Sequence, residues 1–161
     1  MSVLEPNAST ISERMAALVE ANRRGLRTYA MLCPLMPGIS NSPADIDELV
    51  QFSVSHGAEE IFAEPVNGRG SGLIHVENAL RVMSRIVEAD AINEIRHHAA
   101  WSDYAIQLLK AVRGSVRRNA SVKMLRYLLY TSSLSIEHQE WVASHPEGVR
   151  LLGKGADEVV N

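Results

Sequence analysis

Residues 25–43 read GLRTYAMLCPLMPGISNSP, and this stretch decides the predicted fold. The apolar run Leu26–Leu32 is too short for a helix and predicts a buried strand. Cys33–Asn41 follows as a rigid loop that contains two prolines and a glycine. Ser42 and Pro43 then supply a helix N-cap and a proline at the first helical position. The stretch therefore predicts one βα unit.

The segments on either side extend this pattern. Thr10 and Glu13 have the spacing of a capping box, which predicts the start of a helix, and Gly25 is suited to its C-terminal end. The elements expected up to residue 72 are a helix over 11–24, the strand over 26–32, a helix from Pro43 to near Gly57, a strand over 60–64 and a glycine-rich loop over 65–72. Strands that alternate with helices through short connections are typical of parallel βα units.

The pattern becomes mainly helical after Gly72. The expected elements are helices over 76–95 and 104–112, a strand over 124–130, a short helix from Ser135 to about His145 and a last strand over 149–152. The run over 124–130 fits a strand or a helix by periodicity alone, and its two tyrosines favour a strand. We therefore predict an α/β chain with two parts, βα units over 1–74 and a helical and βαβ extension over 75–161 that packs on them.

Size and composition limit the possible architectures. The chain has 161 residues, of which 46% are hydrophobic, so it can bury a substantial core. A complete eight-unit βα barrel usually takes about 250 residues and does not fit. Residues 1–12 lack the basic stretch and following apolar run of a secretory signal. No apolar run in the sequence approaches the length of a membrane span. With a single cysteine, these features predict a cytoplasmic protein.

Cysteine and histidine chemistry offers few candidate sites. Cys33 follows a predicted strand and is a weak candidate for a nucleophile or a radical hydrogen donor, although burial as a small apolar side chain is the more common role. The 6 histidines have no spacing typical of a metal site. No metal site is therefore expected.

Basic residues are concentrated in one segment. Residues 110–126 hold 6 of the 16 basic residues and no acid, namely Lys110, Arg113, Arg117, Arg118, Lys123 and Arg126. Such a segment could bind a nucleic acid through its phosphates. A solvated basic face that balances acidic neighbours is the more common role of such a segment.

The loops that follow the predicted strands are the first places to look for a site, because such loops converge at the mouth of a parallel barrel or sheet. Glu64 could accept hydrogen bonds from a ligand, Asn67 could pair with an amide or a purine edge, and Arg69 could clamp a carboxylate or phosphate. The alternative is that these side chains cap their own loops.

Three motifs in the first 70 residues resemble one family. Residues 4–9 (LEPNAS), 33–39 (CPLMPGI) and 57–59 (GAE) are similar to the second half of radical S-adenosylmethionine (SAM) proteins of the spore photoproduct lyase-like group, also called DNA repair photolyase-like. Residues 125–132 (LRYLLYTS) and 148–153 (GVRLLG) resemble the C-terminal segment of the same group.

The resemblance implies the last units of a partial six-unit βα barrel with SAM across its mouth. By position, the loop Leu35, Met36, Pro37 and Gly38 would approach the methionine or ribose part of SAM. The backbone from Phe62 to Glu64 would meet the adenine, and Asn67 and Arg69 would point at SAM or substrate. The family also has a CxxxCxxC motif for a four-iron four-sulfur cluster, which this chain lacks.

These observations lead to two hypotheses. In the first, the chain is a truncated or partial radical SAM protein that is inactive alone and associates with itself or with a missing N-terminal half. In the second, the chain is a stand-alone nucleic-acid-binding or protein-interaction module that uses Arg113, Arg117, Arg118, Lys123 and Arg126.

Overall fold

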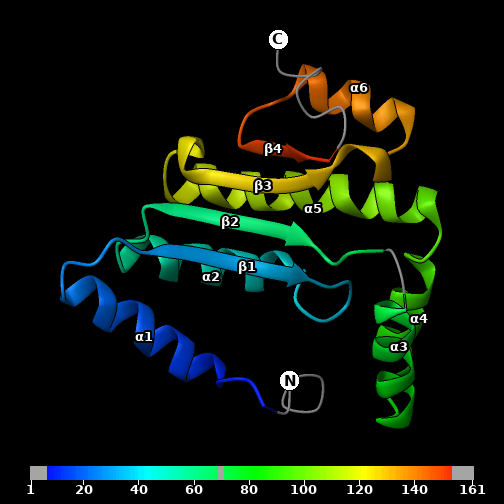
Figure 1. The fold of residues 1–161 in the computed structure, drawn as a ribbon, viewed down its shortest axis with the longest axis horizontal. Helices are drawn as coiled ribbons and strands as arrows, with labels where there is room; N and C mark the ends of the chain where they lie inside the picture. Colours follow the sequence, from blue (N-terminus) through cyan, green and yellow to red (C-terminus); the bar gives the residue numbers. More distant parts are fainter. Residues whose placement is uncertain (1–6, 69–70, 154–161) are drawn as a thin grey trace.

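A parallel sheet forms the centre of the molecule. The computed structural model describes residues 7–68 and 71–153. Its strands, in spatial and sequence order, are β1 (Tyr29–Leu35), β2 (Glu60–Pro65), β3 (Leu125–Tyr130) and β4 (Val149–Leu152) (Figure 1). Each neighbouring pair is parallel. The predicted α/β class with parallel strands is confirmed.

Helices alternate with these strands. They are α1 (Ile11–Arg23), α2 (Pro43–Ser55), α3 (Gly72–Val82), α4 (Ile86–Glu94), α5 (His98–Asn119) and α6 (Ile136–Ser144), with the 3-10 turns η1 (Val122–Met124) and η2 (Thr131–Ser133). Thr10 and Glu13 form the predicted capping box, and the Ser42 hydroxyl caps α2. None of the helices in the described residues is long and apolar enough to cross a membrane.

Three predictions of element bounds were wrong, and one of them is the helix expected over 104–112, which is α5 over 98–119. The first strand spans 29–35 instead of 26–32 and includes Pro34. Proline is tolerated there because it lies where the β1–β2 register is irregular, between Leu32 and Leu35, and because β1 pairs only with β2 among the described strands. The predicted helix over 76–95 is broken into α3 and α4, because Ser84 takes a positive φ of 60° between them.

Two helices cover one face of the sheet. In Figure 1, α2 and α5 lie behind the strands and α5 runs along β3. Alternate strand residues point toward these helices and are fully buried, as at Ile61, Leu125, Tyr127 and Leu129. The core contains residues from both predicted parts of the chain, and the single sheet joins β1 and β2 with β3 and β4.

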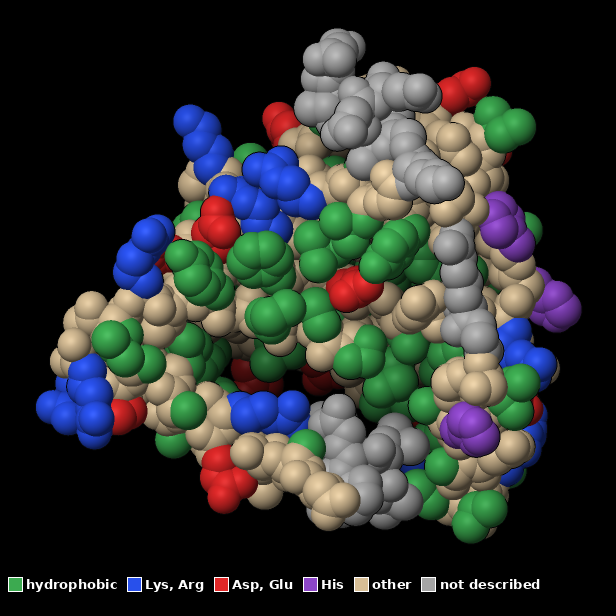
Figure 2. Space-filling view, in the orientation of Figure 1, with side chains coloured by type: hydrophobic (Ala, Val, Ile, Leu, Met, Phe, Trp, Pro, Cys, Tyr) green, Lys and Arg blue, Asp and Glu red, His purple; other side chains and the backbone are tan. Residues whose placement is uncertain are grey.

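The opposite face of the sheet is uncovered by the described residues, and we call it the open face. Figure 2 views this face and shows hydrophobic side chains gathered across its middle. Those that alternate with the buried set are Tyr29, Met31, Phe62, Leu128 and Tyr130, joined by the charged residues Glu60, Glu64 and Arg126. The Met31 side chain is the most exposed of the apolar group at 66%.

Helix α1 is only weakly packed by the described residues. It lies at the lower left of Figure 1, apart from α2 and α5, and buries none of its residues. Ile11 and Val19 are both exposed apolar side chains on this helix. Helices of globular proteins gain most of their stability from a packed apolar face, and the apolar residues of α1 are at most half-buried among the described residues.

Candidate functional site

The C-terminal ends of β1 and β2 bring Cys33 and Glu64 together. The Cys33 thiol is half-buried, and this burial, followed by the negative charge of Glu64, raises its pKa to about 11. A backbone hydrogen bond from Glu64 opposes the shift. A thiol with such a pKa is almost entirely protonated at neutral pH, which is opposite to what a thiolate nucleophile needs. The Glu64 carboxylate forms no ion pair within the described residues.

The predicted SAM loop is folded in on itself. Leu35 and Pro37 are buried, and Met36 packs partly against the core. The backbone N–H of Met36 donates to Ser40 Oγ at 2.9 Å, and that of Gly38 donates to Asn41 Oδ1 at 2.9 Å. These two backbone donors of the loop are therefore used internally.

The remaining predicted cofactor residues lie in different settings. Phe62 is on the open face, where its ring meets Tyr29 edge-on with centroids 6.2 Å apart. Asn67 is exposed beyond the end of β2. Arg69 lies outside the described residues. Glu64, Phe62 and Asn67 are thus the predicted cofactor residues with accessible side chains among those the structure describes.

The residues present do not fit a four-iron four-sulfur cluster. Such a cluster needs several cysteine thiolates, and this chain has one cysteine. The described residues also contain no group of three or more His, Cys, Asp or Glu side chains arranged to hold a metal ion.

The five predicted nucleic-acid residues do not share one surface. Arg118 pairs with Asp47 of α2 at 2.8 Å, whereas Arg126 pairs with Glu60 on the open face. Arg117 pairs with Glu147, which follows α6, and Arg113 is buried. Lys123 is exposed in η1. The nucleic-acid hypothesis stays a prediction, and this dispersion does not favour it.

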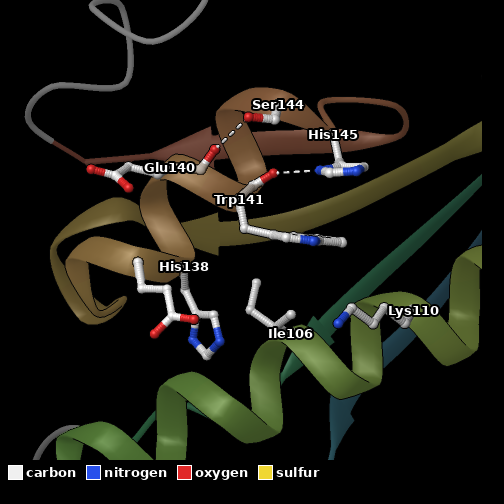
Figure 3. A pocket seen from close by; sticks show the side chains of 8 residues that line it. Ile106, Lys110, His138, Glu140, Trp141, Ser144 and His145 are labelled. Atoms are coloured by element: carbon white, nitrogen blue, oxygen red, sulfur yellow. Dashed lines mark hydrogen bonds between the residues drawn. The ribbon is translucent and has the colours of Figure 1, made fainter.

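A groove between α5 and α6 was not anticipated from the sequence. We call it the α5–α6 groove, and its residues are Ile106, Lys110, Arg113, Arg117, Glu137, His138, Glu140, Trp141, Ser144, His145 and Glu147. Figure 3 shows the Trp141 ring standing between the two helices with Lys110 facing it. The His145 ring stacks on Trp141 with centroids 4.5 Å apart, and Lys110 Nζ lies 4.7 Å from the Trp141 centroid.

A serine and an aspartate of α5 lie beside His138, which lines one end of the groove. Ser102 Oγ lies 2.8 Å from His138 Nδ1, and His138 Nε2 lies 3.7 Å from Asp103 Oδ1. This set resembles a hydrolase triad in composition. However, Ser102 is fully buried and its oxygen accepts the backbone N–H of Ser135 at 2.9 Å. The set therefore fixes the start of α6 against α5 and does not present a nucleophile.

The basic side of the groove could have been predicted from the sequence. Lys110, Arg113 and Arg117 are spaced three and four residues apart, which places them on one face of a helix. No pattern of residues indicated that Trp141 and His145 would lie opposite them, because that placement requires the packing of α6 on α5. Long-range placement of this kind is not encoded in helical spacing.

Comparisons with known proteins identify no relative. No family model, no curated protein and no solved structure matches this chain.

Proposed function

We propose that this chain supplies the last βα units of a larger βα-barrel protein of the radical SAM, spore photoproduct lyase-like kind. The observation that carries the proposal is the sheet itself, whose four parallel strands follow one another in sequence order with α2 and α5 on one face. In a βα barrel the helices lie outside and the opposite face of the strands lines the interior. The apolar open face has the composition that such an interior requires.

The geometry around β1 supports the same proposal. In the order β1-β2-β3-β4, the free edge of β1 can accept further parallel strands. Helix α1 precedes β1 and buries none of its residues, so it has an unused apolar stripe near that edge. Additional βα units, on the same polypeptide or on a separate one, would cover both the edge and the helix.

The proposed role of this chain is to bind and orient. Glu64 would accept hydrogen bonds from amine or hydroxyl groups of SAM or substrate, and Phe62 would offer an apolar surface at the strand ends. The added units would have to supply the three cluster cysteines, because Cys33 alone cannot replace them. The chain by itself is therefore proposed to be inactive in radical chemistry.

The DNA upstream of the Met1 codon offers a direct test. We expect an in-frame or neighbouring segment that encodes βα units with a CxxxCxxC motif. When that segment and this chain are produced together under anaerobic conditions, iron and sulfide should co-purify with the pair, and the chain alone should bind neither. Stoichiometric iron and sulfide on this chain alone would contradict the proposal, and so would the lack of such a segment.

A variant on the free edge makes the test specific. Met31→Glu leaves the backbone unchanged and places a charge on the open face. It should reduce co-purification, whereas Val87→Glu on the exposed surface of α4 should not.

A further inference from the structure

Arg113 is a buried cation that forms no ion pair within the described residues, although its guanidinium lies 5.7 Å from the centroid of the Trp141 ring. Its side chain is 6% exposed, and its Nε is buried without a hydrogen-bond partner within the described part of the chain. One Nη2 hydrogen bond, to the carbonyl oxygen of His145 at 2.8 Å, holds the side chain in the wall of the α5–α6 groove. Removing a charge from water without a partner is costly, so a protein retains such a group where something else neutralises it.

The neighbouring charges increase this cost. Burial and the charge of Arg117 lower the pKa of Arg113, and Glu147 opposes the shift. Arg117 and Glu147 pair with each other at the rim of the groove. Lys110 lies one turn before Arg113, and no carboxylate pairs with it in the described residues. Three cations and one carboxylate at this end of the groove leave an excess of two positive charges.

The shape of the groove allows a ligand larger than an ion. The end that contains Arg113 has a volume of about 580 Å³, in the range of small-molecule sites. Gly114 lines it without a side chain to fill it, and Trp141 with His145 forms the opposite wall. Glu137 and Glu140 line the other end, nearer His138, whereas Arg113 and Arg117 line only this end and Lys110 lies between the two.

We propose that the α5–α6 groove binds a phosphate group, with Arg113 and Lys110 as its ligands and Arg117 at the rim. A phosphate monoester carries between one and two negative charges at neutral pH and so matches the excess positive charge. Guanidinium and ammonium groups form charge-assisted hydrogen bonds to phosphate oxygens. The proposal does not depend on the barrel proposal, because the groove lies between two helices and not on the open face.

The test titrates the full chain with inorganic phosphate, phenyl phosphate and a single-stranded oligonucleotide, observed through the indole N–H signal of Trp141 in NMR spectra. Saturable shifts with inorganic phosphate and tighter binding of phenyl phosphate would support a site for a small phosphorylated molecule. If inorganic phosphate binds saturably and the oligonucleotide binds more tightly, with an affinity that falls steeply with salt, the result would support a nucleic-acid phosphate in the same site.

Two variants and one control make the result specific. Lys110→Met removes an exposed charge with no ion pair and should weaken phosphate binding about tenfold, which corresponds to about 1.4 kcal/mol. Arg113→Met should weaken it further, with folding checked by its NMR spectrum. Arg118→Met is the control, because Arg118 lies on the same helix but pairs with Asp47 outside the groove.

Two results would overturn the proposal. One is the lack of a saturable shift with any of the three probes in the unaltered chain. The other is an equal loss of affinity in Arg118→Met and Lys110→Met, which would indicate general attraction to a basic helix. Phosphate should also raise the unfolding temperature of the unaltered chain more than that of Lys110→Met, because a ligand of the folded state stabilises it.

Discussion

Cys33 should react slowly for a half-exposed thiol. Burial first, and the Glu64 charge second, raise its pKa to about 11, so only a small fraction is thiolate at pH 8. The thiolate is the reactive form, and even with its higher intrinsic nucleophilicity we expect alkylation at pH 8 at least about tenfold slower than in a cysteine peptide. Below the pKa the rate should rise about tenfold per pH unit, which iodoacetamide kinetics would measure.

The effect of the Glu64 charge on the pKa of Cys33 can be separated from the effect of burial. Glu64→Gln removes the negative charge, so the pKa of Cys33 should fall and alkylation at pH 8 should become a few-fold faster. Glu59→Gln is the control, because Glu59 precedes β2 at the opposite end and pairs with Arg27. A Cys33 that titrates near pH 8.5 in the unaltered chain would show that this environment is wrongly described.

Single residues could be predicted from the sequence where their role is local. The Thr10 cap and the positive φ of Gly25 follow from neighbours within a few residues, and both are as expected. The partners of Arg117 and Arg118 could not be predicted. Each pairs with a carboxylate 30 or 71 residues away, so its contact depends on how the helices pack.

Asp47 joins the first helix of the core to the longest one. Its Oδ1 in α2 accepts hydrogen bonds from Ser115 Oγ at 2.6 Å, Arg118 Nη2 at 2.8 Å and Asn119 Nδ2 at 3.2 Å, all on α5. These bonds, those from Ser115 and Arg118 above all, lower the pKa of Asp47. The carboxylate therefore stabilises the folded state when it is ionised.

We expect Asp47→Asn to lower the urea midpoint of unfolding at pH 7, because the amide is a weaker acceptor for Arg118. The sign of the pH dependence follows from the lowered pKa. The stabilisation is fully present above the unfolded aspartate pKa of about 3.9 and is lost as the pH falls through the folded pKa. The two proteins should therefore converge in stability in acid.

Asp45→Asn is the matched control for this link. Asp45 lies in the first turn of the same helix but is exposed, and the described residues show no side-chain bond from it to α5. Its substitution should change the urea midpoint less than Asp47→Asn does. An Asp47→Asn midpoint equal to that of the unaltered chain at pH 7 would mean that the three bonds contribute no net stability.

Elements were predictable where a cap or a turn marks their ends. The expected strand over 149–152 has the observed bounds, and the ambiguous run over 124–130 is a strand over 125–130. The expected helix over 104–112 is far shorter than α5, because its polar exposed residues weaken the apolar pattern beyond both ends. Ser84 gave no signal for the break between α3 and α4, since serine rarely adopts a positive φ.

The sheet as a whole was predictable because each βα unit repeats the same order of turn signals. Parallel neighbours with helical connections follow from that order without any knowledge of the packing. The candidate sites were less predictable. Of the strand-end residues, Glu64 and Cys33 meet as expected for neighbouring parallel strands, whereas the α5–α6 groove depends on how two helices on either side of β3 pack together.

The open face should cause self-association in the chain on its own. It presents a contiguous apolar surface beside an unpaired strand edge, and both features promote contacts between copies. Light scattering coupled to gel filtration should therefore show species larger than a monomer at high micromolar concentration. Met31→Lys places a charge at the most exposed apolar position of this face and should shift the population toward monomer.

Val87→Lys is the matched control for that shift. Val87 is an apolar side chain that is 79% exposed on α4, away from the open face. Both substitutions are at the surface and should change the free energy of unfolding by less than about 0.5 kcal/mol, so a difference between them reports on association. If the unaltered chain remains a monomer at high concentration, the open face is not a surface that needs covering, and the barrel proposal loses its main support.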